Sequence, residues 1–340
     1  MKKASHIAAA LFAAYTLIPN LQAQPLVTID TVTVGDAGNA ADTNGLGAVA
    51  DAFAMGKYEV TIGQYTTFLN SVASVTSASY VVNLWNTSMT TDLNVAGISR
   101  SGSGTELNPY SYSGLGSVNR PIAYVSWFSA ARFANWMNNG ATNGASTETG
   151  AYTLNGATSG IILKNPGASW FLPSGDQWYK AAYYKGGGTD AGYWDFPTQS
   201  DATPGNVIGG ASNQANFTNS LGEYSVTQSS VYSADQNYLT DVGAFSSSAS
   251  AYGTFDQGGN VMEWNDAVVD TNQRGVRGGG YDYGFDHLQS DFTNGVSLNP
   301  VQEFDDVGFR VAAVPEPSTY ALILMAGAGW LLWKRRKRCL

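Results

Sequence analysis

The sequence contains very little cysteine and histidine. Its 340 residues include one cysteine, Cys339, and two histidines, His6 and His287. Cys339 is the second-last residue, so the body of the chain can form neither a disulfide nor a thiolate metal site. Zinc and non-haem iron sites usually need two or three histidines, and His287 alone cannot supply them.

Basic residues are also scarce outside the two ends of the chain. The sequence has 17 Lys and Arg against 26 Asp and Glu, and seven of the basic residues lie in the first three and last seven positions. Without those seven and Glu316, 10 basic and 25 acidic residues remain, a net charge near −15. Nucleic-acid binding depends on clustered Lys and Arg, so no nucleic-acid partner is expected.

Residues 1–23 have the pattern of a secretory signal peptide. Lys2 and Lys3 precede an apolar stretch, residues 7–18, and the small Ala23 marks a cleavage region. The stretch is shorter than the roughly 20 apolar residues of a membrane-spanning helix. We therefore expect export by the Sec machinery and removal of the signal; a buried N-terminal helix is the alternative.

Residues 314–340 have the pattern of a second targeting segment. A Pro-Glu-Pro motif precedes an apolar run, residues 320–333, which ends in a basic cluster. Such a cluster holds its end of a helix on the cytoplasmic side. The segment resembles the PEP-CTERM sorting signal, which implies cleavage by an exosortase, a C-terminal hydrophobic helix in transient contact with the membrane, and delivery to the cell envelope, cell surface or medium. A permanent single-pass anchor is the alternative. The residues of the sorting motif are Pro315, Glu316 and Pro317.

Six short blocks between these ends follow one another in an order typical of one protein family. They are residues 55–61 (MGKYEVT), 120–138 (RPIAYVSWFSAARFANWMN), 170–182 (WFLPSGDQWYKAA), 258–264 (GGNVMEW), 274–281 (RGVRGGGY) and 308–313 (GFRVAA). Together the blocks resemble the formylglycine-generating-enzyme-like (sulfatase-modifying factor) family over residues 27–313. The resemblance implies an α+β fold related to the C-type lectin fold, with little regular secondary structure, long loops and bound calcium.

Three of the blocks carry local helix signals. Tyr65 and Phe68, just after the first block, have the spacing of a helix face. In the second block, apolar residues would bury one side of a helix that starts near Ser126. In the third block, Pro173 and Ser174 open a helix, with Ser174 as its N-cap. Segments rich in Gly, Ser, Thr and Asn, 139–160 and 246–251, are predicted to be surface loops.

The family pattern implies two calcium sites built from oxygen ligands, which calcium prefers. The first would use the side chains of Asp256 and Glu263 with the carbonyl groups of Gly259 and Val261. The second would use Asn216, the carbonyl group of Phe217, and Asp235. The alternative is that these polar groups only hydrogen-bond to loop backbone, as most buried polar groups do.

Catalytic members of the family hold copper between two cysteines, and the alignment of the blocks places those positions at Tyr283 and Leu288. Neither side chain can bind copper(I), which prefers soft thiolate ligands. Two other positions also differ from the family pattern: Gly280 stands where the family usually has Ser, and Met262 stands where it has the first aromatic residue of a WEW motif. No copper or iron is therefore expected, and the single body histidine excludes the iron-binding branch of the family.

These features favour an exported, non-catalytic, calcium-stabilised module that acts in binding or assembly of extracellular material. Its partner would be a polysaccharide or a surface protein, contacted by a loop with aromatic side chains that can stack on sugars or peptides. The loop residues are Tyr281, Tyr283 and Phe285. Two alternatives stay open: a protein-modifying oxidoreductase related to formylglycine-generating enzyme with a rearranged site, and a structural protein of the extracellular matrix.

Overall fold

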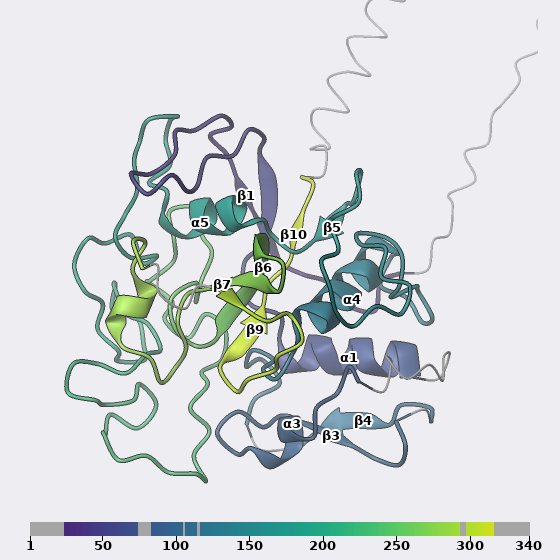
Figure 1. The fold of residues 1–340 in the computed structure, drawn as a ribbon. Coiled ribbons are helices and arrows are strands. Elements are labelled where there is room, and N and C mark those ends of the chain that lie inside the picture. The colour runs from purple at the N-terminus through teal and green to yellow at the C-terminus, as the bar shows by residue number, and fades with distance from the viewer. Residues whose placement is uncertain (1–23, 74–82, 105, 114–115, 293–296, 316–340) are drawn as a thin grey trace, which may run out of the picture.

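The computed structural model describes residues 24–73, 83–104, 106–113, 116–292 and 297–315. The predicted signal peptide and the apolar tail lie outside the described residues. Within them the chain forms short helices and short strands joined by long loops (Figure 1). The α+β, loop-rich fold expected from the sequence is confirmed.

Helix α1 (Ile62–Ala73) follows strand β2 (Phe53–Gly56). At its start Thr61 Oγ1 accepts a hydrogen bond from the N–H of Gln64, and the Gln64 side chain accepts one from the N–H of Thr61. This reciprocal cap satisfies two backbone donors that the helix itself leaves unpaired. The buried face includes Tyr65 and Phe68, so the predicted helix face is confirmed.

Helix α4 (Trp127–Asn138) begins where the sequence predicts, because Ser126 Oγ accepts from the N–H of Ser129 and caps it. The sequence predicts burial of one side, whereas the structure buries every residue of α4 except the last. The helix lies between α1 and strand β5 (Trp170–Phe171) in Figure 1. Its small Ala side chains allow this close packing from several directions.

Helix α5 (Gly175–Tyr183) has the predicted N-cap. Ser174 and Gln177 form a capping box, with bonds of 3.1 Å and 2.9 Å between each side chain and the other backbone N–H. Two further helical segments are single turns. They are α3 (Ser88–Thr91) and the 3-10 helix η1 (Phe285–Leu288).

Among the described residues the strands form three small sheets, with orders β1-β2-β10-β5, β8-β7-β6-β9 and β3-β4. All neighbours are antiparallel except β6 and β9, which are parallel. The strands not yet located are β1 (Thr31–Val34), β3 (Ile98–Arg100), β4 (Tyr110–Tyr112), β6 (Met262–Asp270), β7 (Gln273–Arg277), β8 (Ser297–Leu298), β9 (Val307–Phe309) and β10 (Ala312–Ala313).

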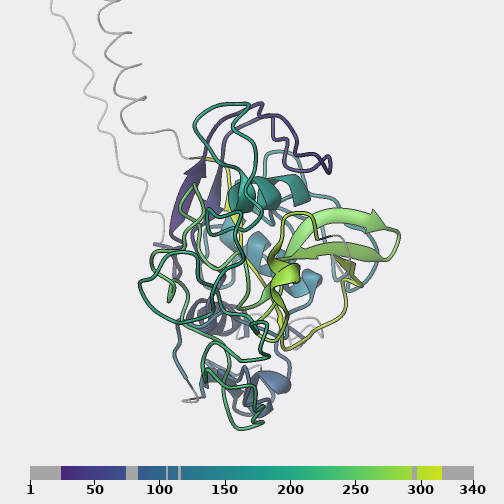
Figure 2. The ribbon, with the colours of Figure 1, turned by 90° about the vertical axis from the view of Figure 1, so that its left-hand side faces the viewer.

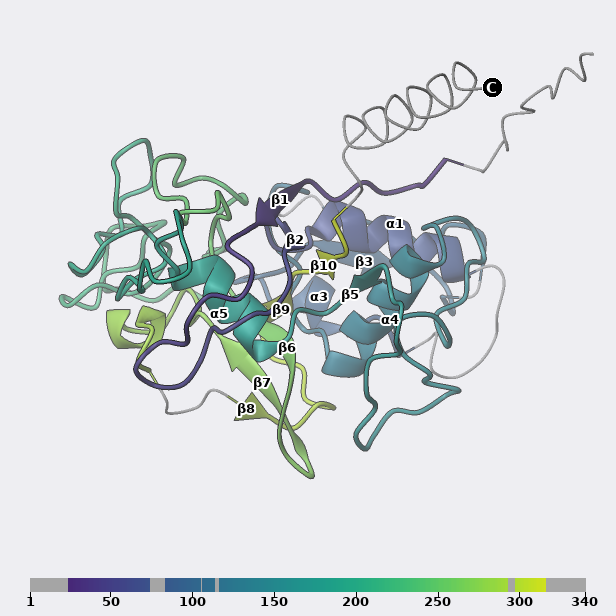
Figure 3. The same ribbon diagram turned by 90° about the horizontal axis from the view of Figure 1, so that it is seen from above.

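The C-terminal end of the described chain joins the two four-stranded sheets. β9 pairs with β6 in one sheet, and β10, only three residues later, lies between β2 and β5 in the other. The segment 307–313 is therefore held from both sides, and Arg310 lies at its midpoint. The far end of the β6–β7 hairpin projects from the body in Figures 2 and 3.

The segment from residue 184 to residue 261 contains no helix or strand and forms a group of loops on one side of the molecule (Figures 1 and 3). Amide side chains replace the missing backbone ladders. Asn206 Nδ2 donates to the carbonyl oxygen of Glu223 at 2.7 Å, and Gln228 Nε2 donates to that of Asn206 at 3.1 Å. Such bonds satisfy the backbone groups that irregular structure leaves unpaired.

Replacing Ser174 with Ala removes one half of the α5 capping box, so we expect Ser174→Ala to lower the free energy of unfolding by about 1 kcal/mol. Ser174→Asp keeps an N-cap acceptor and should stay close to wild type. Urea unfolding of the three proteins measures the difference. Equal loss in both variants would show that the cap is not the source of the effect.

Candidate functional site

A fully buried ion pair joins β6 to the segment between β9 and β10. Glu263 lies in β6 and Arg310 follows β9, and both side chains are 0% exposed. Arg310 Nε donates to Glu263 Oε2 at 2.6 Å, and Arg310 Nη2 donates to Glu263 Oε1 at 2.5 Å. The two bonds fix the orientation of both groups, because the guanidinium is planar and presents its donors in a rigid fork.

The same two side chains also contact three other parts of the chain. Arg310 Nη1 donates to the carbonyl oxygen of Gly56, at the end of β2, at 3.0 Å, and Nη2 donates to that of Phe255 at 2.8 Å. Trp178 Nε1, in α5, donates to Glu263 Oε2 at 2.7 Å. Both carboxylate oxygens of Glu263, one of the predicted calcium ligands, therefore already accept bonds from protein donors.

Glu59, which the sequence analysis did not single out, is electrostatically coupled to this ion pair. It is 1% exposed, and neither carboxyl oxygen has a hydrogen-bond partner among the described residues. Burial raises the pKa of Glu59 well above its ordinary value; the charge of Asp256 raises it further, and Arg310 lowers it. A buried carboxyl group without a partner is costly, so this position is suited to a cation. One feature of the sequence could have indicated Glu59: it is an acidic residue between Tyr58 and Val60, in a block of otherwise strand-like residues.

Asp256, the other predicted side-chain ligand, lies in the loop before β6. Its backbone is left-handed, with φ of 59°, and its Oδ2 accepts a bond from the N–H of Gly243 at 2.6 Å. Burial raises the pKa of Asp256 to about 6, although the bond from Gly243 and the charge of Arg310 oppose this shift. Arg310 is already paired with Glu263, and among the described residues the carboxyl groups of Glu59 and Asp256 form no ion pair of their own.

Asn216 and Gly259, predicted for different calcium sites, lie side by side. They form a parallel bridge in which the N–H of Asn260 donates to the carbonyl oxygen of Asn216 at 2.8 Å. A Cβ atom on Gly259 would lie 2.1 Å from that oxygen, and the backbone φ of Gly259 is 84°, so only glycine fits at this position. The Asn216 amide donates to the carbonyl oxygen of Tyr238 and to Asn260 Oδ1, both at 3.0 Å.

The other predicted calcium ligands have different surroundings. Val261 is fully buried beside Tyr238 and Tyr281. The carbonyl oxygen of Phe217 accepts a bond from Ser225 Oγ at 3.2 Å. Asp235 is exposed, and its backbone N–H donates to Ser233 Oγ at 3.3 Å.

In the described ranges, no group of three or more His, Cys, Asp and Glu side chains is arranged to hold a metal ion. A cation beside Glu59 and Asp256 would therefore depend on carbonyl or water oxygens as well. Calcium accepts such mixed sets of six to eight oxygen ligands. The unpartnered carboxyl group of Glu59 fits a calcium ion, and Glu263 fits a role in which it orients the surrounding loops.

The three aromatic residues of the predicted ligand loop are packed against the protein to different degrees. Tyr281 is 3% exposed, its ring stacks on Tyr238 with centroids 5.7 Å apart, and its hydroxyl donates to Asp305 Oδ2 at 2.9 Å. Phe285 packs beside Leu288 in a small apolar cluster. The face of Tyr281 is therefore used inside the fold, whereas Tyr283 and Phe285 are both half-buried.

Tyr283 and Leu288 stand at the family's copper-binding positions; Tyr283 lies two residues before the 3-10 turn η1, and Leu288 is its last residue. Leu288 is 0% exposed in its apolar cluster, and the Tyr283 ring lies 4.4 Å from that of His287. Burial and the charge of Asp282 raise the pKa of Asp306 to about 7, and its bond to Tyr283 opposes this shift. These groups offer a phenol, an imidazole and a carboxyl group, but no thiolate.

Of the sorting motif, only Pro315 lies within the described residues. The preceding Val314 donates its N–H to the carbonyl oxygen of Ser169 at 2.9 Å, so the folded body extends to the edge of the motif. No helix in the described part of the chain is long and apolar enough to cross a membrane. The hydrophobic helix expected over residues 320–333 lies outside that part.

Comparison with models of protein families gives one match over most of the chain. The family model of the sulfatase-modifying factor enzyme 1-like domain matches residues 28–314, and the model of the PEP-CTERM protein-sorting motif matches residues 313–337. The comparison with curated proteins gave no match.

Several solved structures are similar to this chain. The crystal structure of CarF shares 21% identity and covers 85% of this chain and 99% of that chain, with a TM-score of 0.49. Treponema denticola variable protein 1 shares 16% identity, and the match covers 85% of this chain and 96% of that chain, with a TM-score of 0.46. PvdO from Pseudomonas aeruginosa shares 15% identity, and the match covers 85% of this chain and 92% of that chain, with a TM-score of 0.42.

Removing one partner of the buried ion pair leaves an uncompensated charge, so we expect Glu263→Gln to lower the free energy of unfolding by about 3–5 kcal/mol. The exposed pair Lys185–Asp201, with atoms 3.7 Å apart, is the matched control, and Asp201→Asn should cost under about 1 kcal/mol. Denaturant unfolding measures both. Similar small losses in the two variants would contradict the central role of the buried pair.

Proposed function

This chain belongs to the sulfatase-modifying factor enzyme 1-like family and carries a PEP-CTERM sorting motif, and we propose that it is a calcium-stabilised binding module without oxidase chemistry. The sorting motif indicates export and a location at the cell envelope or surface after processing. The calcium, the binding role and the absence of catalysis are the parts that we propose.

The observation that carries the proposal is the chemistry at Tyr283 and Leu288. These residues occupy the positions at which the family resemblance implies the two copper-binding cysteines. Leu288 is wholly buried among apolar side chains, and Tyr283 offers a hard oxygen ligand in place of a soft thiolate. The only cysteine of the chain, Cys339, follows the basic cluster of the sorting segment. The body therefore has no pair of thiolates with which to bind copper(I).

Calcium is proposed to bind beside Glu59 and Asp256, with carbonyl oxygens of the Gly259 to Val261 segment completing its ligands. Two carboxyl groups lacking a cationic partner support this assignment. The bound ion would neutralise them and hold the loop before β6 against the end of β2. Glu263 and Arg310 would position these elements around it.

A module of this kind would bind or assemble extracellular material. The body carries a strong excess of acidic residues, which disfavours acidic partners and leaves neutral polysaccharides and surface proteins as candidate partners. A structural role in the extracellular matrix and an oxidoreductase with a rearranged site are the competing functions. An oxidoreductase of this kind would have to build its rearranged site from Tyr283, His287 and Asp306.

A direct test of the missing chemistry is copper(I) binding by the purified exported protein, in competition with bicinchoninate. We expect no stoichiometric copper binding, and no oxygen consumption when a cysteine-containing peptide is added. Tightly bound copper that is lost in His287→Ala, together with oxygen consumption, would instead establish the oxidoreductase.

Calcium should stabilise the protein more at pH 8 than at pH 5. Because the folded-state pKa of Asp256 is raised to about 6 and that of Glu59 is also raised, their contribution to stability falls as the pH rises through these values. In chelator, we therefore expect this cluster to lower the melting temperature as the pH increases, and calcium to reverse the loss.

Glu59→Gln should remove most of the calcium-dependent shift in melting temperature, because it removes one of the two charges that bind the ion. The exposed Asp190 provides a control, and Asp190→Asn should keep the full shift. A calcium response that survives in Glu59→Gln would place the ion elsewhere.

A further inference from the structure

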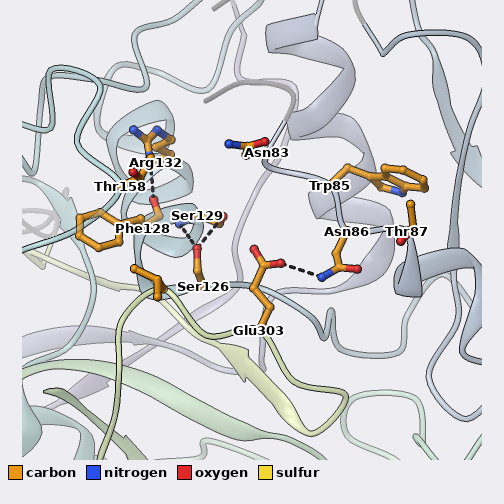
Figure 4. A pocket seen from close by; sticks show the side chains of 11 residues that line it. Asn83, Trp85, Asn86, Thr87, Ser126, Phe128, Ser129, Arg132, Thr158 and Glu303 are labelled. Carbon is orange, nitrogen blue, oxygen red and sulfur yellow. Dashed lines mark hydrogen bonds between the residues drawn. The ribbon is translucent and has the colours of Figure 1, made fainter. Parts of the chain in front are cut away.

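A half-open cavity of about 390 Å³ lies at the N-terminal end of α4, apart from the residues proposed for calcium (Figure 4). It is bounded by the segment before α3, the first two turns of α4 and the segment before β9. Small-molecule sites generally have volumes of about 300–1,000 Å³, so this cavity is large enough for a small ligand. Its polar and aromatic lining includes Asn83, Trp85, Asn86, Ser126, Ser129 and Glu303.

Glu303 provides the main acceptor of the cavity. Its Oε2 accepts a bond from Asn86 Nδ2 at 2.7 Å, whereas its Oε1 has no hydrogen bond among the described residues. Burial raises the pKa of Glu303, and the bond from Asn86 opposes this shift. Figure 4 shows the carboxylate reaching into the space between Asn86 and the two serines. One oxygen is therefore held in place and the other is available to a ligand.

The opposite wall is made rigid by the start of α4. Ser126 Oγ caps the helix and lies 2.9 Å from Ser129 Oγ, so the two hydroxyl groups are fixed relative to each other. Arg132, one turn further along, forms a bidentate ion pair with Glu148 at 2.7 Å and 3.2 Å. The only basic side chain of the lining is thus already neutralised and does not compensate the charge of Glu303.

The third wall is aromatic. Trp85 Nε1 donates to the carbonyl oxygen of Ile98 at 3.3 Å, and the Arg100 guanidinium lies 4.3 Å from the centre of its ring. These contacts hold the indole at the edge of the cavity. Phe128 adds a second apolar surface beside the serine hydroxyls.

We propose that this cavity binds one unit of a neutral saccharide, with Glu303 accepting bonds from its hydroxyl groups and asparagine amides donating to them. A sugar hydroxyl both donates and accepts, which matches a lining that mixes a carboxylate, amides and hydroxyls. The apolar face of a sugar ring suits an aromatic wall. An organic cation is disfavoured because it needs acceptors alone, whereas the amides and hydroxyls of this lining donate as well as accept. The inference rests on the proposed binding function and gives it a site and a ligand class.

The test is saturation-transfer NMR and calorimetry on the purified exported protein with glucose, galactose, mannose and N-acetylglucosamine, and with spermidine as a cationic probe. We expect at least one neutral sugar to bind and spermidine not to compete with it. Glu303→Ala should weaken binding about tenfold or more, because it removes an acceptor from a desolvated site. Glu303→Gln should stay within about threefold of wild type, since an amide still bonds to a hydroxyl.

Two further variants control for folding and position. Glu223 also accepts a bond from an asparagine amide, Asn219, at 2.9 Å but lies outside the cavity, so Glu223→Ala should leave sugar binding unchanged. Thr158 is exposed at the edge of the cavity, and Thr158→Trp should block it without disturbing the core. Melting temperatures show whether each variant is folded.

Each contrary outcome overturns the inference in a different way. Spermidine binding that is lost in both Glu303→Gln and Glu303→Ala would make this a cation site. Sugar binding that survives in Glu303→Ala and Thr158→Trp would refute the cavity but leave the proposed binding function intact. If no sugar in the panel binds, the saccharide assignment is refuted. The proposed absence of oxidase chemistry is tested separately, by the copper-binding and oxygen-consumption measurements.

Discussion

The bidentate bond between Arg310 and Glu263, formed where neither group contacts water, is the constraint on which the rest of the structure depends. A guanidinium and a carboxylate lose their hydration on burial, so their bonds must be complete and well oriented. Arg310 meets this requirement by also bonding to carbonyl oxygens at Gly56 and Phe255. One side chain thereby sets the relative positions of β2, the loop before β6, and β6 itself. In a fold with so few strands and helices, such bonds replace the ladders that larger sheets would provide.

The same arrangement is the basis for the cation that we propose nearby. Glu263 satisfies Arg310, so the buried carboxyl groups of Glu59 and Asp256 share no positive charge of their own. Burial raises the pKa of each, which means that ionising them costs stability. A divalent ion would remove that cost at neutral pH. The stabilising pair and the proposed ion site are thus two consequences of placing three carboxyl groups around one arginine.

The sequence predicted those parts of the fold that depend on local patterns. Ser126 and Ser174 cap helices where their spacing to the following residues indicates, and the order of the six blocks matches the family found by comparison. Long-range bonds were not predictable in this way. The family pattern assigned Glu263 to a calcium site, and its bonds to Arg310 were not predictable because Arg310 lies far along the chain. Glu59 was overlooked because a lone acid in a strand-like block gives no sign that its oxygens will be buried without partners. Tyr281 appeared to be an exposed loop residue, and its stacking on Tyr238 depends on a loop whose path no local pattern specifies.

The central claim is that the carboxyl groups left over by the buried ion pair bind a divalent cation. Anomalous X-ray diffraction from crystals grown in calcium, recorded at a wavelength where calcium scatters anomalously, tests it most directly. The account predicts a single strong peak within bonding distance of carboxylate oxygens of Glu59 and Asp256, with Glu263 still bonded to Arg310. A well-ordered structure with no peak there, or with Glu59 bonded to a protein donor instead, would contradict it.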